Sequence, residues 1–169
     1  MRRISLIIAT LLLVLMTQAQ STPEDLGKEV FAAFQSQDLN LLDGHFPDPQ
    51  AILAQTAATG IEFTEFQKQD FIINFPYQIQ RYKMQCDMML KTDLGTKVNW
   101  MESIYENSEK QVWEVPVALD STKVLEATDV KIHFKDAAGK YTITLSECLE
   151  LGGKWYLGGG QVQLSAWKE

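Results

Sequence analysis

Three side chains in this sequence, Asp87, Tyr82 and Tyr105, are of the types that carry acid–base chemistry. A carboxylate can act as a base, and phenolic hydroxyls can donate hydrogen bonds to a developing oxyanion, provided that all of them line one apolar pocket. No spacing in the sequence marks the three residues as a set. An isolated titratable residue is a weak signal, so a surface aspartate and half-buried core tyrosines are the favoured interpretation.

The sequence contains no recognisable pattern of a metal site or of an activated nucleophile. Its two histidines, His45 and His133, and its two cysteines, Cys86 and Cys148, lie far apart, and there is no Cys-x-x-Cys motif. Residues so placed do not make a zinc cluster. We expect His45 in a loop with local hydrogen bonds, and His133 on the polar, solvated face of a strand. The sequence therefore predicts no metal, no cofactor and no strong hydrolase or transferase activity.

Aromatic side chains offer a second candidate site. Trp100, Trp113 and Trp155 fall on core-facing positions of predicted strands, so packing is favoured over ligand contact. An open apolar pocket between helices and sheet is the alternative, and the default role of such a concavity is binding. Its walls would come from five aromatic residues: Tyr82, Trp100, Tyr105, Trp113 and Trp155.

The two cysteines are expected to be free thiols. Cys86 lies on the apolar face of a predicted helix, whereas Cys148 continues a strand face that points away from the helices. A disulfide needs Cα atoms about 4.4–6.8 Å apart, which two opposed faces do not provide. Two arguments stand on the other side: a bulge near Glu147 would turn Cys148 around, and export would oxidise any close pair.

The first twenty residues have the order of a secretory signal, with Met1-Arg2-Arg3, an apolar run from Ile4 to Met16, and small residues at Thr17-x-Ala19. The run is shorter than the roughly 20 apolar residues that span a bilayer. We expect a signal peptide over residues 1–19, release into the periplasm or outside the cell, and one domain over residues 20–169. That domain carries 13 basic and 22 acidic side chains, a net charge of −9, which disfavours nucleic acid as a partner.

Helical periodicity occupies the first half of the chain, up to residue 94. Thr22 with Pro23, Asp38, Asp48 with Pro49, and the pattern Thr64-x-x-Gln67 predict four helix starts. Pro76 must kink or end the fourth helix. Beyond Pro76 one apolar face is formed by Ile79, Tyr82, Cys86, Met89 and Leu90. The methionines of this segment are expected to fill gaps in the core: Met84, Met88 and Met89.

From Lys97 the apolar period changes to two, which predicts strands. Short turns at Asp136–Gly139 and Gly152-Gly153 make neighbouring strands antiparallel. Pro116 indicates an edge strand, and Gly158-Gly159-Gly160 a bulge or bend rather than a phosphate loop. One face is expected to be buried against the helices: Val130, Ile132, Phe134, Ile143 and Leu145. The other is expected to face solvent: Lys131, His133, Thr142 and Thr144.

Two segments carry a family resemblance. Residues 34–46, with Ser36-Gln37-Asp38-Leu39 after an amphipathic helix, resemble the opening of nuclear-transport-factor-2-like domains. Gly152-Gly153-Lys154-Trp155-Tyr156-Leu157-Gly158 resembles the closing hairpin of secreted bacterial members of that cystatin-like fold. The resemblance implies an α+β fold, with N-terminal helices packed on one face of a curved, mostly antiparallel sheet that forms a cone with an apolar pocket. The long segment from Phe63 to Leu94 departs from the common pattern.

The resemblance leaves three functions open, because function cannot be read from fold alone. The first is a secreted, non-catalytic domain that binds a small apolar ligand or a protein partner. The second is an enzyme of the ketosteroid-isomerase or cyclase type, although no residue maps onto that family's catalytic positions. The third, weaker still, is an inhibitor of an exported protease.

Overall fold

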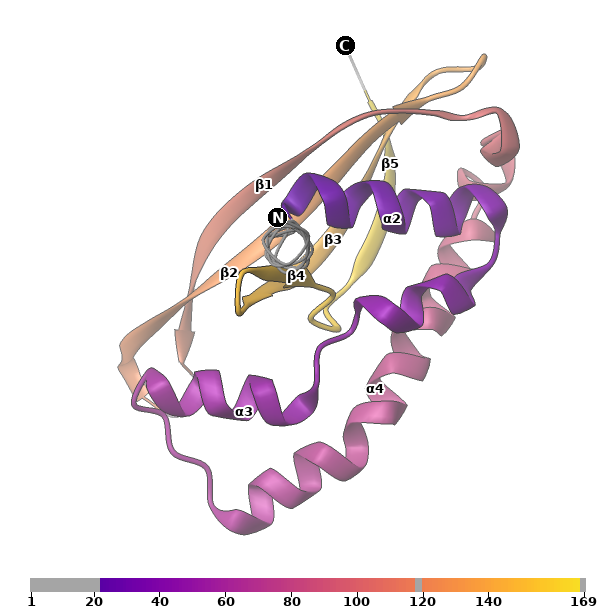
Figure 1. Cartoon of the computed structure of the whole chain (residues 1–169). Coiled ribbons are helices and arrows are strands. Elements are labelled where there is room, and N and C mark those ends of the chain that lie inside the picture. Colours follow the sequence, from indigo (N-terminus) through magenta and orange to yellow (C-terminus); the bar gives the residue numbers. More distant parts are fainter. Residues whose placement is uncertain (1–21, 118–119, 168–169) are drawn as a thin grey trace, which may run out of the picture.

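The computed structural model of this chain describes residues 22–117 and 120–167, and the side chains of residues 22–114 and 126–167. The predicted signal segment, residues 1–19, lies outside the described residues. Helices come first along the chain and strands follow (Figure 1). The helical elements are α2 (Pro23–Ser36), η1 (Leu39–His45), α3 (Pro49–Ala58), α4 (Glu65–Leu90), η2 (Gly95–Lys97) and η3 (Trp100–Glu102). The strands are β1 (Ile104–Val117), β2 (Asp120–Lys135), β3 (Lys140–Leu151), β4 (Lys154–Tyr156) and β5 (Val162–Ala166).

All four predicted helix starts are confirmed by their caps. Thr22, Asp38, Asp48 and Thr64 each accept a hydrogen bond from a backbone N–H in the first turn. At α2 and α4 the side chain of the third helical residue also accepts a hydrogen bond from the backbone N–H of the cap residue, which completes a capping box. A polar cap satisfies N–H groups that have no partner inside the helix, so these caps determine where the helices begin.

Helix α4 continues through Pro76, so of the two alternatives expected there, a kink or an end, the end is wrong. Its residues Phe75, Tyr82, Cys86 and Met89 are buried on both sides of the proline, and this packing outweighs the lost hydrogen bond.

The expectation that three methionines fill the core is wrong for two of them. Met89 is buried, but Met84 and Met88 are each 60% exposed. At 3.6 residues per turn Met84 and Met88 lie opposite the face that carries Tyr82 and Cys86, so they cannot reach the core.

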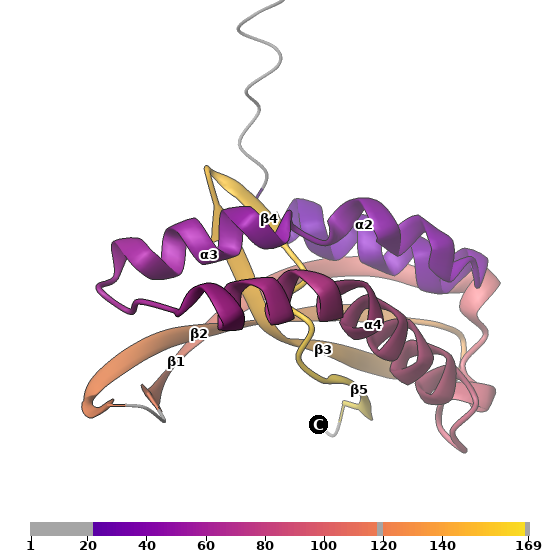
Figure 2. The same cartoon turned by 90° about the horizontal axis from the view of Figure 1, so that it is seen from below.

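The strands form an antiparallel sheet in the order β1-β2-β3-β4, and β5 pairs with β3 along the edge opposite β2. The helices contact the sheet through α2 on β1 and β2, α4 on β5, and α3 on β3 (Figure 2). This arrangement confirms the predicted α+β class, with N-terminal helices packed on an antiparallel sheet. Strand β1 is an edge strand, as Pro116 predicts.

The predicted inner face of the sheet is confirmed. Its five residues, Val130, Ile132, Phe134, Ile143 and Leu145, are all fully buried. They pack against Val30, Phe31 and Phe34 of α2 within one core. Phe134 contacts the rings of Phe31, Trp100 and Tyr141 at centroid distances of 5.2–5.3 Å.

The opposite face is only half-exposed, so the expectation of a solvated His133 is wrong. Its side chain is 12% exposed, because Trp167 packs on the ring at a centroid distance of 5.0 Å. Nδ1 of His133 lies 3.0 Å from Oγ1 of Thr142, and Nε2 lies 3.4 Å from a carboxylate oxygen of Glu109.

Two strand predictions fail at β1. The strand expected from Lys97 begins only at Ile104, because Gly95–Lys97 and Trp100–Glu102 form the short helices η2 and η3, although Trp100 is buried as expected. Trp113 is 41% exposed and not in the core. Residues 109–114 are all exposed, because this part of the β1–β2 hairpin extends beyond α2 (Figure 1).

A bulge at Glu147 interrupts β3. The residues of β3 before the bulge pair with β5, and those after it pair with β4. Thr128 pairs with Cys148 while Val130 pairs with Leu145, so β3 contains one extra residue, and Glu147 adopts a φ of 59°. Asp129 stabilises the bulge, since one carboxylate oxygen accepts the N–H of Glu147 at 3.2 Å. The β4–β5 loop packs directly on it, because a Cβ on Gly158 would overlap the carbonyl oxygen of Glu147.

The bulge turns Cys148 into the core, where it is 3% exposed. The expectation that Cys148 points away from the helices is therefore wrong, and the alternative geometry near Glu147 is the one observed.

Among the described residues, no helix is both long enough and apolar enough to cross a membrane.

Candidate functional site

The five aromatic residues proposed as pocket walls lie in different parts of the described structure. Tyr82 lies in the core at 1% exposure, and Trp100 lies at 4% with its indole N–H donating to the carbonyl of Gly95. Tyr105 is half-buried and donates its hydroxyl proton to Oγ of Ser108. Trp155 borders a cleft beside α3, while Trp113 lies on the exposed hairpin.

The candidate acid–base residues also lie apart. Asp87 forms an exposed ion pair with Lys91 at 2.6 Å, on a different face of α4 from Tyr82. Tyr105 is on β1, and burial raises its pKa. His45 is mostly buried, which lowers its pKa, and its Nδ1 lies 3.3 Å from a Glu29 carboxylate oxygen without hydrogen-bond geometry. Among the residues whose side chains are described, no three His, Cys, Asp or Glu residues gather in a way that could hold a metal ion.

A buried titratable cluster does exist, and it consists of Tyr82, Cys86 and Cys148. Both cysteines are free thiols, and burial raises the pKa of each to about 12. Burial also raises the pKa of Tyr82 well above its usual value, and the two nearby thiols add to this effect. All three groups are therefore neutral at physiological pH, and none is an acid or base that works near neutrality.

The hydroxyl of Tyr82 has no hydrogen-bond partner in the described part of the chain. A buried polar group without a partner costs about 1–3 kcal/mol of stability. We expect Tyr82→Phe to raise the free energy of unfolding by roughly 1 kcal/mol, since the ring contact with Phe46 at 5.5 Å is kept. Chemical denaturation measures the change. The matched control is Tyr105→Phe, which breaks the bond to Ser108 and should lower stability; a loss of stability in Tyr82→Phe would contradict the prediction.

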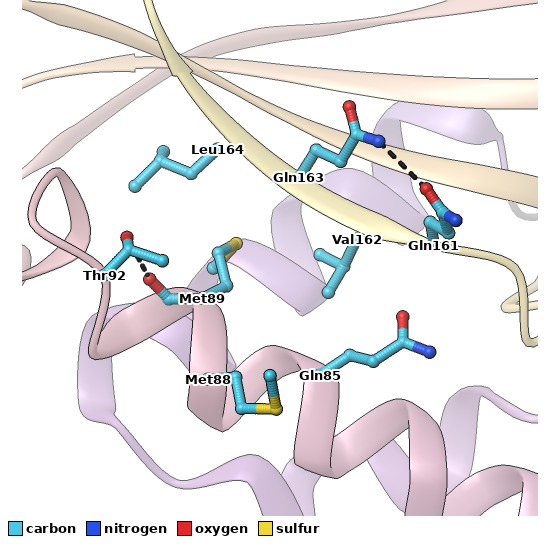
Figure 3. A pocket seen from close by; sticks show the side chains of 8 residues that line it. All are labelled: Gln85, Met88, Met89, Thr92, Gln161, Val162, Gln163 and Leu164. Carbon is cyan, nitrogen blue, oxygen red and sulfur yellow. Dashed lines mark hydrogen bonds between the residues drawn. The ribbon is translucent and has the colours of Figure 1, made fainter.

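An open groove of about 570 Å³ lies between α4 and β5 (Figure 3). No lining side chain carries a charge. Four of the lining side chains are apolar: Met88, Met89, Val162 and Leu164. The other four carry an amide or a hydroxyl: Gln85, Thr92, Gln161 and Gln163. The lining side chains of the groove therefore include no carboxylate, amine or imidazole.

The groove follows the free edge of β5. Successive residues of a strand point to opposite faces, so a concavity lined by four consecutive residues, 161–164, must border the strand's edge. In the described chain β5 pairs only with β3. Figure 3 shows Val162 directed toward α4, and Gln163 donating to Gln161 along the strand at 3.0 Å.

The hydrogen-bond ladder fixes which backbone groups of β5 are free. Ser146 N–H donates to the carbonyl of Gln161 at 2.9 Å, and Trp167 N–H donates to the carbonyl of Lys140 at 2.8 Å. In an antiparallel pair, the backbone N–H and C=O groups of successive residues point alternately toward and away from the neighbouring strand. The backbone groups of the odd-numbered residues between Gln161 and Trp167 therefore also point toward β3. The backbone groups of Val162, Leu164 and Ala166 consequently point to the outer edge.

A second cleft of about 470 Å³ lies between α3 and the sheet. Trp155 forms part of its wall, and Nζ of Lys110 lies 5.9 Å from the centroid of that indole ring. Lys110, Glu126 and Glu150 add charges, and Gln55 of α3 donates to the carbonyl of Glu150 across the cleft. This cleft holds one of the predicted pocket residues.

Sequence reasoning missed the groove residues Gln85, Gln161, Gln163 and Leu164. Nothing in the alternation of β5 indicates that α4, about seventy residues earlier in the chain, lies beside it. Comparisons with known protein families, with curated proteins and with solved structures find no match to this chain.

Proposed function

We propose that this protein is a non-catalytic binding domain whose partner is a protein segment in extended conformation. The observation that carries the proposal is the uncharged groove along the free edge of β5. An extended segment adding to that edge would bond to the outward backbone groups of Val162, Leu164 and Ala166. Its alternate side chains would contact Met88 and Gln85 of α4. Strand addition beside a helix is a recurrent mode of peptide recognition.

The lining favours a peptide over a small apolar ligand. Half of the eight lining side chains carry amides or hydroxyls, and the groove is open along one side. Small-ligand sites bury most of the ligand surface and are lined mainly by apolar groups. A peptide backbone, in contrast, has the donors and acceptors that glutamine side chains and a free strand edge can satisfy. The export and the nuclear-transport-factor-2-like affiliation expected from the sequence belong to this proposal and agree with a partner outside the cytoplasm.

Ketosteroid-isomerase-like or cyclase-like chemistry finds less support. It requires a carboxylate with a raised pKa facing hydroxyl donors in an apolar pocket. Asp87 is paired with Lys91 at the surface, and Tyr82 is enclosed in the core. No described observation specifically favours inhibition of a protease.

The test is titration of the isotopically labelled protein with a neutral probe peptide, acetyl-Thr-Val-Gln-Val-Gln-Thr-amide, followed by amide NMR. We expect saturable shifts at residues 161–167 and slower hydrogen exchange at Val162, Leu164 and Ala166. A single short strand should bind with a dissociation constant on the order of 0.1–1 mM. Saturable shifts confined to the α3 cleft would contradict the proposal, as would binding of a sterol or fatty acid to the groove without peptide binding.

Leu164 offers a matched pair of variants. Leu164→Pro removes the outward N–H, and proline is tolerated on an edge strand when its missing N–H faces away from the neighbouring strand. Leu164→Ala removes the same side chain but keeps that N–H. We expect Leu164→Pro to abolish peptide binding and Leu164→Ala to retain it. Equal loss in both variants would assign recognition to the side chain and would overturn strand addition.

A further inference from the structure

Helix α4 carries an exposed apolar stripe along its outer side. The stripe consists of Phe66, Ile73, Tyr77, Met84 and Met88, which are 79%, 67%, 67%, 60% and 60% exposed. Their spacings are 7, 4, 7 and 4 residues, an 11-residue repeat that keeps the five positions on one side of the helix. At 100° per residue the five positions fall within an arc of about 60°.

The stripe lies opposite the face of α4 that packs on the core. Phe75, Tyr82, Cys86 and Met89 are the buried residues of this helix, and they point about 180° away from the stripe. Helix α4 lies at the outside of the molecule in both views, with no described element in front of it in Figure 2. Nothing in the described chain therefore covers these five side chains.

The stripe has the size of a protein–protein contact. Aromatic side chains such as Phe66 and Tyr77 carry roughly 150–250 Å² each. With the flanking polar residues, the five exposed side chains approach the roughly 800 Å² that each partner buries in a stable interface. Patches of this size on a soluble protein mark interaction sites.

The charges beside the stripe make it complementary to itself. Asp70 and Arg81 lie on the same flank, about 40° and 60° from Phe66. Asp70 accepts a hydrogen bond from Asn74, and neither Asp70 nor Arg81 makes an ion pair with any residue whose side chain is described. The opposite flank carries the neutral Gln69 and Gln80, and Asp87, which is paired with Lys91.

A twofold axis at Tyr77, perpendicular to α4, brings these features together. It sets Tyr77 against Tyr77 of the second copy, and Phe66 against Met88 of that copy. Such an axis keeps each flank on its own side of the contact, so Asp70 meets Arg81 of the second copy. The two residues are then three positions apart, about 4.5 Å along the helix axis, within reach of an ion pair.

We propose that α4 is a homodimer interface, in which two copies pack their stripes antiparallel about Tyr77 and form two Asp70–Arg81 ion pairs. The contact is isologous, because each copy offers the same surface. The proposal rests on Asp70, Tyr77 and Arg81, which do not line the peptide groove. Met88, at one end of the stripe, also lines that groove, so a bound peptide and the second copy would share this one side chain.

Sedimentation velocity of the protein, expressed from its full-length reading frame, tests this proposal. We expect a dimer for the unmodified protein and a monomer for Tyr77→Lys. Met101→Lys is the matched control, because Met101 is 81% exposed but lies in η3 outside the stripe, and this variant should stay dimeric. Thermal melts of both variants check that each is folded.

A charge exchange tests the arrangement of the two copies. Asp70→Arg and Arg81→Asp should each raise the dissociation constant at least about tenfold, because each sets like charges together. The double variant should regain the dimer. A monomer at about 0.1 mM, a dimer unaffected by Tyr77→Lys, or a double variant no better than the single ones would overturn the proposal.

Discussion

In the folded protein, Cys86 and Cys148 are expected to react with a thiol reagent at least about a thousandfold more slowly than an exposed cysteine. The thiolate is the reactive form, and burial raises the pKa of each thiol from 9.0 to about 12, which lowers the thiolate fraction by three powers of ten. Exposures of 0% for Cys86 and 3% for Cys148 slow the approach of the reagent further. Reaction should therefore follow the rate of opening of the core.

The measurement is a time course with an aromatic disulfide reagent at pH 8, with and without denaturant and without prior reduction. The unfolded, unreduced protein should release two equivalents within seconds. Release of none would show a disulfide between the cysteines. Rapid reaction of one thiol in the folded state would contradict the buried position of that cysteine.

The same pKa shifts make the fold sensitive to alkali. A thiol whose pKa is higher in the folded state contributes stability that is complete below the unfolded pKa, near 9, and is lost as the pH rises toward 12. Between these limits each thiol lowers the free energy of unfolding by about 1.4 kcal/mol per pH unit. Cys86→Ala and Cys148→Ala should each reduce the steepness of this decline.

Local patterns were sufficient to predict the order of the elements and the inner face of the sheet. Thr22 and Thr64 predict helix starts because a cap acts on its own first turn. Val130, Ile132 and Phe134 predict a buried face because alternation in a strand is geometric. In both cases the interaction that determines the structure lies within a few residues of the signal.

The remaining features depend on contacts that are distant in sequence. The bulge at Glu147 requires Asp129 of β2 and the close approach of Gly158, and it reverses the direction of Cys148. Trp113 has an alternating pattern that suits a core strand, but its part of β1 lies beyond α2. The α4–β5 groove exists only because two segments far apart in the chain meet. The local periodicity of a single sequence does not show which distant segments come into contact.

Replacing Ile143 with alanine should lower the free energy of unfolding by about 2–5 kcal/mol, the usual cost of a large cavity in a core. Ile143 is fully buried at the centre of the sheet, paired with Ile132 on β2 and Leu164 on β5. Its position joins the α2 side of the core to the strand that borders the groove. Loss of its side chain should therefore weaken both regions together.

Ile104 provides a matched control, because it is also an isoleucine in a strand but is 59% exposed. Ile104→Ala should change the free energy of unfolding by less than about 0.5 kcal/mol. Urea unfolding of the two variants gives both values on one scale. Shifting β3 by one residue would carry Ile143 to the outer face and Thr142 or Thr144 to the inner one. Equal, small losses in the two variants would therefore mean that the register of β3 is wrong, and the outward backbone groups of β5 would be assigned incorrectly along with it.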